Sequence, residues 1–210
     1  MPMLPYESPW MDDDLQTFRE TVARFVETEM VPNDPKWRAQ HGVGKEIWRK
    51  AGEMGLLCLD LPAEYGCGGG DFRHEVVLYE ELSRRGLSGF GQGVHSICAH
   101  YINNYGTEAQ KQRWLPRMAR GELIGAIAMT EPGAGSDLQG IRTRAVLEGD
   151  HYRINGSKIF ITNGGQASLL MLVTRTNTDD RKHGLSLIMV ETENLPGYRV
   201  GRVLDKMGMP

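Results

Sequence analysis

The chain has 210 residues, of which 40% are apolar, and a formal net charge of −3 with acidic and basic residues interspersed, so it can bury a core as one large domain or two small ones. The sequence has no basic stripe of the kind that indicates nucleic-acid binding, and its longest apolar runs are too short to cross a bilayer. The N-terminus resembles neither a signal nor a transit peptide, and three scattered cysteines favour a reducing compartment, which together predict a cytoplasmic protein of bacterial type.

Helical periodicity dominates the first part of the chain. The predicted helices are 12–31, 44–54, 72–85 and 94–105. Pro32 and Pro35 are expected to end the first of them. Thr107 and Gln110 form a capping box that should begin a further helix, because each side chain can satisfy the other residue's backbone N–H. The sequence therefore predicts a helical N-terminal domain over 1–121.

From residue 122 the pattern changes to short apolar or alternating runs separated by turn residues. The predicted strands are 123–129, 141–147, 151–155, 157–162, 168–174 and 185–191. Asn155-Gly156 lies between two of these runs, and Asn-Gly favours a hairpin turn. Several short strands in succession predict an antiparallel β-barrel or sandwich over 122–210. The last residues have the pattern of a segment in mid-course, so we expect this β domain to be incomplete.

The loop MTEPGAGSDLQG, residues 129–140, directly follows the first of these runs. It lacks the lysine of a P-loop and the third glycine of a Rossmann fingerprint, which excludes both phosphate-binding motifs. Composition alone favours a tight connection, in which Gly133 and Gly135 allow positive φ, about as strongly as a ligand-binding loop. In the second interpretation Thr130 and Ser136 add hydroxyl donors to free backbone N–H groups.

Two long motifs resemble a known family. AMTEPGAGSDLQGIRTRA (128–145) and INGSKIFITNGGQA (154–167) are similar to the signature of the acyl-CoA dehydrogenases, most of all to the long-chain branch, and the match extends over nearly the whole chain. The resemblance implies an α+β multidomain fold with a helical domain, a middle β domain and a C-terminal four-helix domain after residue 210. It also implies FAD as the cofactor and a homotetramer.

The chemistry that this resemblance implies is the α,β-dehydrogenation of a fatty acyl-CoA to trans-2-enoyl-CoA in fatty-acid β-oxidation. FAD would take the β-hydride, and an electron-transfer flavoprotein would be the next acceptor. The catalytic base of the family is a glutamate that we expect beyond residue 210, so no residue here is assigned as the base and this chain alone is expected to be inactive. An acyl-CoA oxidase and a non-catalytic subunit remain alternatives.

The resemblance also assigns cofactor-binding residues. Thr130 would hydrogen-bond the pyrimidine edge of the flavin, whereas Phe160 would cover the other side of the ring with the Thr162 hydroxyl near N5. Many relatives have tryptophan where this chain has Phe160. The phenylalanine ring can still stack on the flavin, but it lacks the N–H donor of tryptophan. The complete predicted set is Ile127, Ala128, Met129, Thr130, Gly135, Ser136, Phe160, Ile161 and Thr162.

The residues assigned to the acyl-CoA substrate are Ser136, Gly93, Lys182 and His183. Gly93 would leave volume in the floor of the acyl pocket and so favour a long chain, although an ordinary helix connection explains it too. Lys182 and His183 would reach the CoA, or form only a solvated basic turn. Glu131 is interpreted as a carboxylate that holds the loop, with no partner assigned. The histidines of 94–105 lack a carboxylate at ligand spacing, so we expect no metal site.

Overall fold

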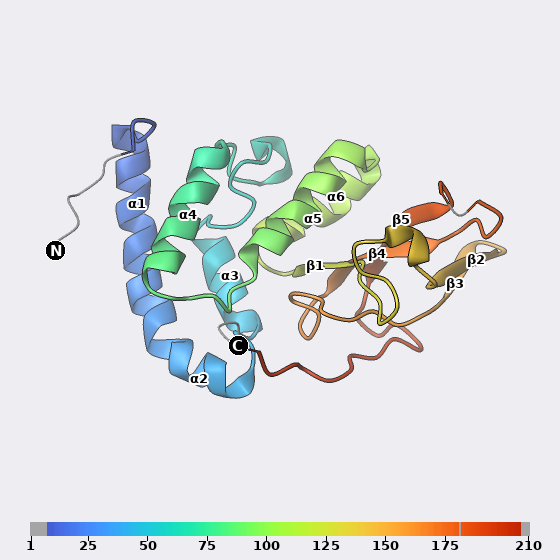
Figure 1. Ribbon diagram of the computed structural model, residues 1–210. Coiled ribbons are helices and arrows are strands. Elements are labelled where there is room, and N and C mark those ends of the chain that lie inside the picture. Colours follow the sequence, from blue (N-terminus) through green and yellow to red (C-terminus); the bar gives the residue numbers. More distant parts are fainter. Residues whose placement is uncertain (1–7, 181, 207–210) are drawn as a thin grey trace. The chain divides into compact units, whose positions relative to one another are not determined.

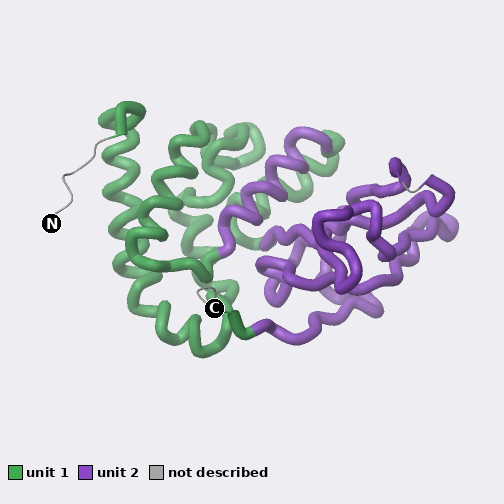
Figure 2. The backbone as a smooth tube through the Cα atoms, in the orientation of Figure 1, with its two compact units in different colours: residues 1–90, 106–122, 205–210 green, residues 91–105, 123–204 purple. Residues whose placement is uncertain are grey.

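The computed structural model describes residues 8–180 and 182–206 (Figure 1). Its chain forms two compact units (Figure 2), a helical unit of residues 1–90, 106–122 and 205–210 and a sheet unit of residues 91–105 and 123–204. Helices come first along the chain and strands follow, as the sequence predicts. No helix among the described residues is long and apolar enough to span a membrane.

The helical unit contains five α-helices in its described part. They are α1 (Asp13–Phe25), α2 (Asp34–Gln40), α3 (Lys45–Glu53), α4 (Phe72–Arg84) and α6 (Glu108–Ala119). The Asp12 carboxylate caps α1 by accepting from the Leu15 N–H at 2.9 Å. Thr107 and Gln110 form the predicted capping box at the start of α6. Trp48 on α3 is fully buried, so the apolar stripes of these helices form the core of this unit.

The expected end of the first helix at Pro32 is wrong. After α1 the chain continues through a π-turn (Val26–Met30) and a 3-10 turn (Val31–Asn33) into α2. Pro32 and Pro35 are each the second residue of the helical segment that contains them. A proline is tolerated there because the first N–H groups of a helix have no acceptor within the helix.

In its described residues the sheet unit combines one α-helix with a five-stranded sheet. Its elements are α5 (Gln92–Tyr105), β1 (Gly125–Ala128), a 3-10 turn (Leu138–Gly140), β2 (Arg144–Glu148), β3 (His151–Asn155), β4 (Leu169–Arg175) and β5 (Leu185–Glu191). The strand order is β1-β4-β2-β3, with β5 also paired to β4. All of β4 is buried, and its Leu170 and Leu172 pack with Ala126 and Ala128 of β1.

This sheet is mixed, which corrects the expectation of a purely antiparallel arrangement. β1 pairs with β4 in parallel, with Ala128 opposite Leu172, and Arg144 of β2 is also parallel to β4. The β2–β3 and β4–β5 pairs are antiparallel. Parallel pairing requires a long crossover, and the chain between β1 and β4 provides one that contains both family motifs.

The hairpin turn predicted at Asn155-Gly156 is also wrong. The turn of the β2–β3 hairpin is Gly149-Asp150, where Glu148 pairs with His151 and Gly149 has φ of 66°. A glycine with positive φ at the first central position suits a type II′ turn. After β3 the chain leaves the sheet, so the strand expected over 157–162 does not form. Contacts with the 129–140 loop hold this segment instead.

Candidate functional site

The two motifs meet within the sheet unit. Thr130 follows β1 by two residues, and its carbonyl oxygen accepts from the N–H of Ile159 at 2.9 Å. The Lys158 ammonium group donates to the carbonyl oxygen of Met129 at 2.8 Å. Residues that are almost thirty positions apart therefore form one surface, and the predicted segments 127–136 and 160–162 lie beside each other.

The start of the loop is a tight turn. Glu131 and Ala134 exchange backbone hydrogen bonds of 2.9 and 3.1 Å across Pro132-Gly133. Neither Gly133 nor Gly135 has positive φ, which corrects the conformational reason expected for them. A Cβ atom at either position would meet nothing within 4 Å. These glycines therefore leave open space beside the backbone, where a bound group can approach closely.

The loop also presents free hydrogen-bond donors. Within the described part of the chain, the backbone N–H groups of Thr130, Gly133, Gly135 and Ser136 donate to no protein acceptor. Gly133, Gly135 and Ser136 are exposed, and Thr130 is half-buried at the end of β1. Exposed N–H groups on neighbouring residues suit a ligand that carries several acceptor atoms.

The second segment carries an unusual backbone conformation. Phe160 has φ of 60° although it is not glycine, and 69% of its surface is exposed. Such a conformation costs about 1–2 kcal/mol for a residue with a side chain and is typical of functional sites. Ile161 instead packs against the β1–β4 core, as does the buried Ala128, so the side chains of these two residues contribute to the core of the sheet unit. Thr162 is half-buried.

Asn163 connects this segment to α5 and β1. Its side-chain amide donates to the carbonyl oxygens of Gly91 at 2.8 Å and Gly125 at 3.0 Å. A Cβ atom at Gly91 would lie 2.2 Å from the Asn163 Oδ1 and 3.0 Å from a methyl carbon of Thr162. The absence of a side chain at Gly91 therefore lets the start of α5, with the half-buried Gly93, lie beside the predicted cofactor segment.

Glu131 is the anchor of the loop. Its buried carboxylate accepts from the Arg142 N–H at 2.8 Å, from the Thr143 N–H at 2.9 Å, from the Thr143 hydroxyl at 2.5 Å and from Lys158 at 2.9 Å. Burial raises the pKa of a carboxylate, but hydrogen bonds from Thr143, Arg142 and Lys158 outweigh it and lower the pKa of Glu131 to about 2. These residues are the partners of Glu131 in the loop-holding role that the sequence predicts. With this pKa, the Glu131 carboxylate is ionised at neutral pH.

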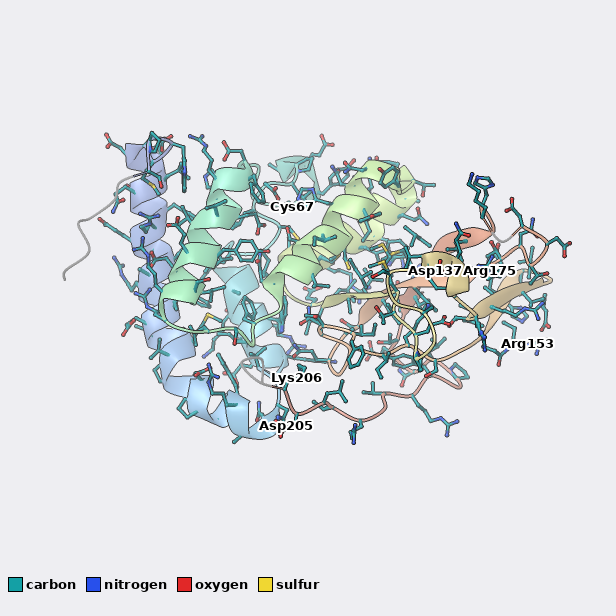
Figure 3. The ribbon with its side chains drawn as sticks, in the orientation of Figure 1. Cys67, Asp137, Arg153, Arg175, Asp205 and Lys206 are labelled. Atoms are coloured by element: carbon teal, nitrogen blue, oxygen red, sulfur yellow. The ribbon has the colours of Figure 1, made fainter. Side chains whose placement is uncertain are left out.

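The far end of the loop is fixed by Arg175, the last residue of β4 (Figure 3). Its buried guanidinium group donates to the carbonyl oxygens of Gln139 at 2.9 Å and Asp180 at 3.1 Å. The Asp180 carboxylate accepts from the backbone N–H groups of Lys182 at 2.9 Å and His183 at 2.8 Å. The predicted substrate turn therefore lies at the same end of the sheet as the loop, with its two basic side chains exposed.

Several residues that hold the site together are not assigned to it from the sequence. His95 is buried on α5 and accepts from the Gly125 N–H at 3.1 Å, which fixes the start of β1. Lys158 and Asn163 stand inside the second motif, so their position could have drawn attention to them. His95 and Arg175 stand in ordinary helix and strand patterns, and no local signal identifies them. Among the described residues, no cluster of His, Cys, Asp and Glu could hold a metal ion.

Comparison with models of known protein families shows to which family this chain is related. Residues 12–122 match the N-terminal domain of acyl-CoA dehydrogenases, and residues 126–210 match the middle domain. The chain belongs to the acyl-CoA dehydrogenase family. The two motifs that meet at Thr130 and Ile159 both lie in the part that matches the middle domain.

Curated members of the acyl-CoA dehydrogenase family resemble this chain over about half of their length. The mitochondrial long-chain specific acyl-CoA dehydrogenase of Mus musculus is 45% identical over 91% of this chain and 45% of its own. A short-chain specific acyl-CoA dehydrogenase of Clostridium acetobutylicum is 40% identical over 91% of this chain and 51% of its own. Similarity therefore extends to relatives named for different acyl-chain lengths.

Solved structures of acyl-CoA dehydrogenases have the same fold. That of the enzyme from Geobacillus kaustophilus matches with a TM-score of 0.90 and 42% identity, over 95% of this chain and 53% of its own. A glutaryl-CoA dehydrogenase from Mycobacterium smegmatis in complex with FADH2 matches with a TM-score of 0.83 and 32% identity, over 94% of this chain and 50% of its own.

Proposed function

We propose that this chain forms the flavin-binding and acyl-CoA-binding part of an FAD-dependent acyl-CoA dehydrogenase. The observation that carries the proposal is the loop after β1, where the N–H groups of Thr130, Gly133, Gly135 and Ser136 have no acceptor in the described chain. A loop with such donors is stable in water, but it is also complementary to a ring edge rich in acceptor atoms. Family membership and the FADH2-bound relative make a flavin the ligand of choice.

The residues present fit a flavin ring. The backbone and hydroxyl donors of Thr130 suit the pyrimidine edge, and the open space beside Gly135 allows the loop backbone to come close to the ligand. Phe160 offers an exposed aromatic face, and stacking on a planar ring would offset the cost of its left-handed conformation. When bound, FAD supplies the two-electron acceptor that α,β-dehydrogenation requires.

In this proposal the chain's own residues bind and orient the reactants. Thr130 and Thr162 position the ring, while Ser136 lies where it can also reach the CoA part of the substrate. Phe160 excludes water from the side of the ring that it covers. The basic turn of Lys182 and His183 would attract the CoA phosphates. The base that removes the α-proton is proposed to come from outside residues 1–210, and the electrons to pass to an electron-transfer flavoprotein.

We further propose a long acyl chain as the substrate, because Gly93 adds no side-chain volume to the first turn of α5, two residues after Gly91, where a Cβ atom would contact Thr162. The domain boundary near residues 121–122, a C-terminal four-helix domain, a homotetramer and a cytoplasmic location are also proposals. Transfer of electrons to oxygen instead of a flavoprotein would make the protein an oxidase. A protein that retains the fold without turnover would be a non-catalytic subunit.

The test is an anaerobic titration of the full-length protein with palmitoyl-CoA, followed by visible absorbance. A flavin band that bleaches on addition is the expected result, and parallel titrations with butyryl-CoA and octanoyl-CoA rank the chain lengths. Reoxidation by air compared with reoxidation by an electron-transfer flavoprotein separates an oxidase from a dehydrogenase. A colourless protein, or a yellow one inert to every acyl-CoA, would remove the enzymatic proposal.

A further inference from the structure

We propose that Lys158 is a positioning residue that sets the direction of the peptide between Met129 and Thr130, and that Glu131 holds Lys158 in place for this task. The inference rests on the proposed function, because the group that this peptide would face is the flavin. It adds to that function two charged residues that need not touch the ligand themselves.

The first step of the argument is peptide geometry. In a trans peptide the C=O and the next N–H point in opposite directions. The Met129 carbonyl oxygen lies 2.8 Å from the Lys158 ammonium group, so the N–H of Thr130 points away from Lys158. The following carbonyl, that of Thr130, is held by the Ile159 N–H at 2.9 Å. Two consecutive peptides are therefore fixed, and the Thr130 N–H faces out of the protein network.

The second step is the burial of the ion pair. The Lys158 side chain is 9% exposed and the Glu131 side chain 6% exposed, at an N–O distance of 2.9 Å. Burial lowers the pKa of Lys158, whereas the nearby Glu131 carboxylate acts in the opposite direction and favours the charged form. A buried pair gains little net stability over an apolar pair of similar size, so its presence is better explained by a requirement for defined geometry.

The third step is the rigidity of the anchor. Besides Lys158, the Glu131 carboxylate accepts from two backbone N–H groups and a hydroxyl at Arg142 and Thr143, just before β2. Glu131 is thus tied to the sheet independently of Lys158. The ammonium group is held between this fixed carboxylate and the Met129 carbonyl, and a shift of either partner would rotate the peptide that presents the Thr130 N–H.

Three variants of the full-length protein separate positioning from stability. Lys158→Met removes the hydrogen bond to Met129 but leaves Glu131 as a buried charge without its cation. Glu131→Gln combined with Lys158→Met removes both charges, which should restore much of the lost stability. Thr143→Val is the matched control, because it removes one hydrogen bond to Glu131 and leaves the contact between Lys158 and Met129 intact.

The measurements are the dissociation constant of FAD for the apoprotein, the reduction potential of the bound flavin, and the thermal midpoint. We expect FAD binding to weaken about tenfold or more in Lys158→Met and in the double variant, since a misdirected donor loses at least one hydrogen bond to the ligand. The flavin potential should also become more negative in both. Thr143→Val should lower the thermal midpoint with less than about a threefold change in FAD binding.

The double variant decides the outcome even if Lys158→Met fails to fold. Wild-type FAD affinity and potential in a folded double variant would overturn the inference, because the pair would then serve stability alone. A change in FAD affinity in Thr143→Val as large as that in the double variant would also overturn it. Failure of the wild-type apoprotein to bind FAD would instead contradict the proposed function, so the two failures are distinguishable.

Discussion

Phe160→Gly should separate what the protein needs to fold from what it needs to bind its cofactor. Phe160 has φ of 60° and 69% of its surface is exposed, so the folded chain gains little from the ring and strains its backbone to present it. Glycine adopts this conformation without penalty. The substitution therefore removes the aromatic face and the strain together. The hydrogen bonds of the segment from Ile159 to Asn163 should remain, because they are formed by the neighbours of residue 160.

The magnitude follows from three opposing contributions. A phenylalanine buries about 200 Å² when fully enclosed, so the buried third of this ring contributes about 1.5 kcal/mol to folding. Release of the left-handed strain returns about 1–2 kcal/mol. The added flexibility of glycine in the unfolded chain costs about 0.4–1 kcal/mol. The free energy of unfolding should consequently fall by no more than about 1.5 kcal/mol.

Binding should respond much more strongly than folding. Loss of an aromatic stacking partner costs about 0.5–1.5 kcal/mol beyond the loss of contact area, so FAD affinity should fall about tenfold or more. Urea unfolding of the apoprotein measures the first effect, and titration of the same apoprotein with FAD measures the second. Phe160→Trp, which keeps a ring, is the matched control and should bind FAD well. A folded Phe160→Gly variant with unchanged FAD affinity would refute the reasoning.

Three further substitutions test other parts of the structure. Gly121→Ala should destabilise the protein by more than about 2 kcal/mol in chemical unfolding, because Gly121 has φ of 66° and its Cβ would lie 2.0 Å from the Trp48 carbonyl oxygen; Gly55→Ala, with the same φ and open space, should cost only about 1 kcal/mol. The lowered pKa of Glu131, about 2 against an ordinary 4.5, should contribute about 3 kcal/mol of stability that is present above pH 5 and is lost as the pH falls toward 2. Urea unfolding between pH 6 and pH 3 should therefore show a steeper loss for the wild type than for Glu131→Gln, and parallel curves would contradict the assignment. Gly93→Glu should shift turnover toward shorter acyl-CoAs, and an unaltered chain-length profile would remove the argument for a long pocket.

The sequence predicts the elements of this fold better than their connections. Amphipathic periodicity places α3, α4 and α5 within a few residues, because the burial of one helix face is a local property of the sequence. Asn155-Gly156 does not form the turn that its sequence favours, because a local turn preference competes with tertiary contacts. Here Lys158 and Ile159 bind the loop after β1, and Gly156 packs against Thr143.

The candidate site was predictable only in part, for a similar reason. The motifs indicated which segments matter, but their juxtaposition depends on the parallel pairing of β1 with β4, which leaves no periodic mark in the sequence. Asn163, His95 and Arg175 each act through backbone groups far away in the chain. A side chain that binds distant backbone atoms has no characteristic sequence neighbours, so only the structure reveals it.

The glycines show how an unexplained feature can indicate a ligand. Gly121 is required by its φ and its close neighbour, and Gly91 by its close neighbours alone. Gly135 has neither reason, and neither does Gly42, which lies in a surface connection of the helical unit. An open glycine is therefore not by itself a binding site. Gly135 differs because it stands among free N–H donors, in a loop that hydrogen-bonds the residue before the strained Phe160. Three features that cost stability or contribute none occur together, and a ligand that uses all three is the simplest physical reason for the arrangement.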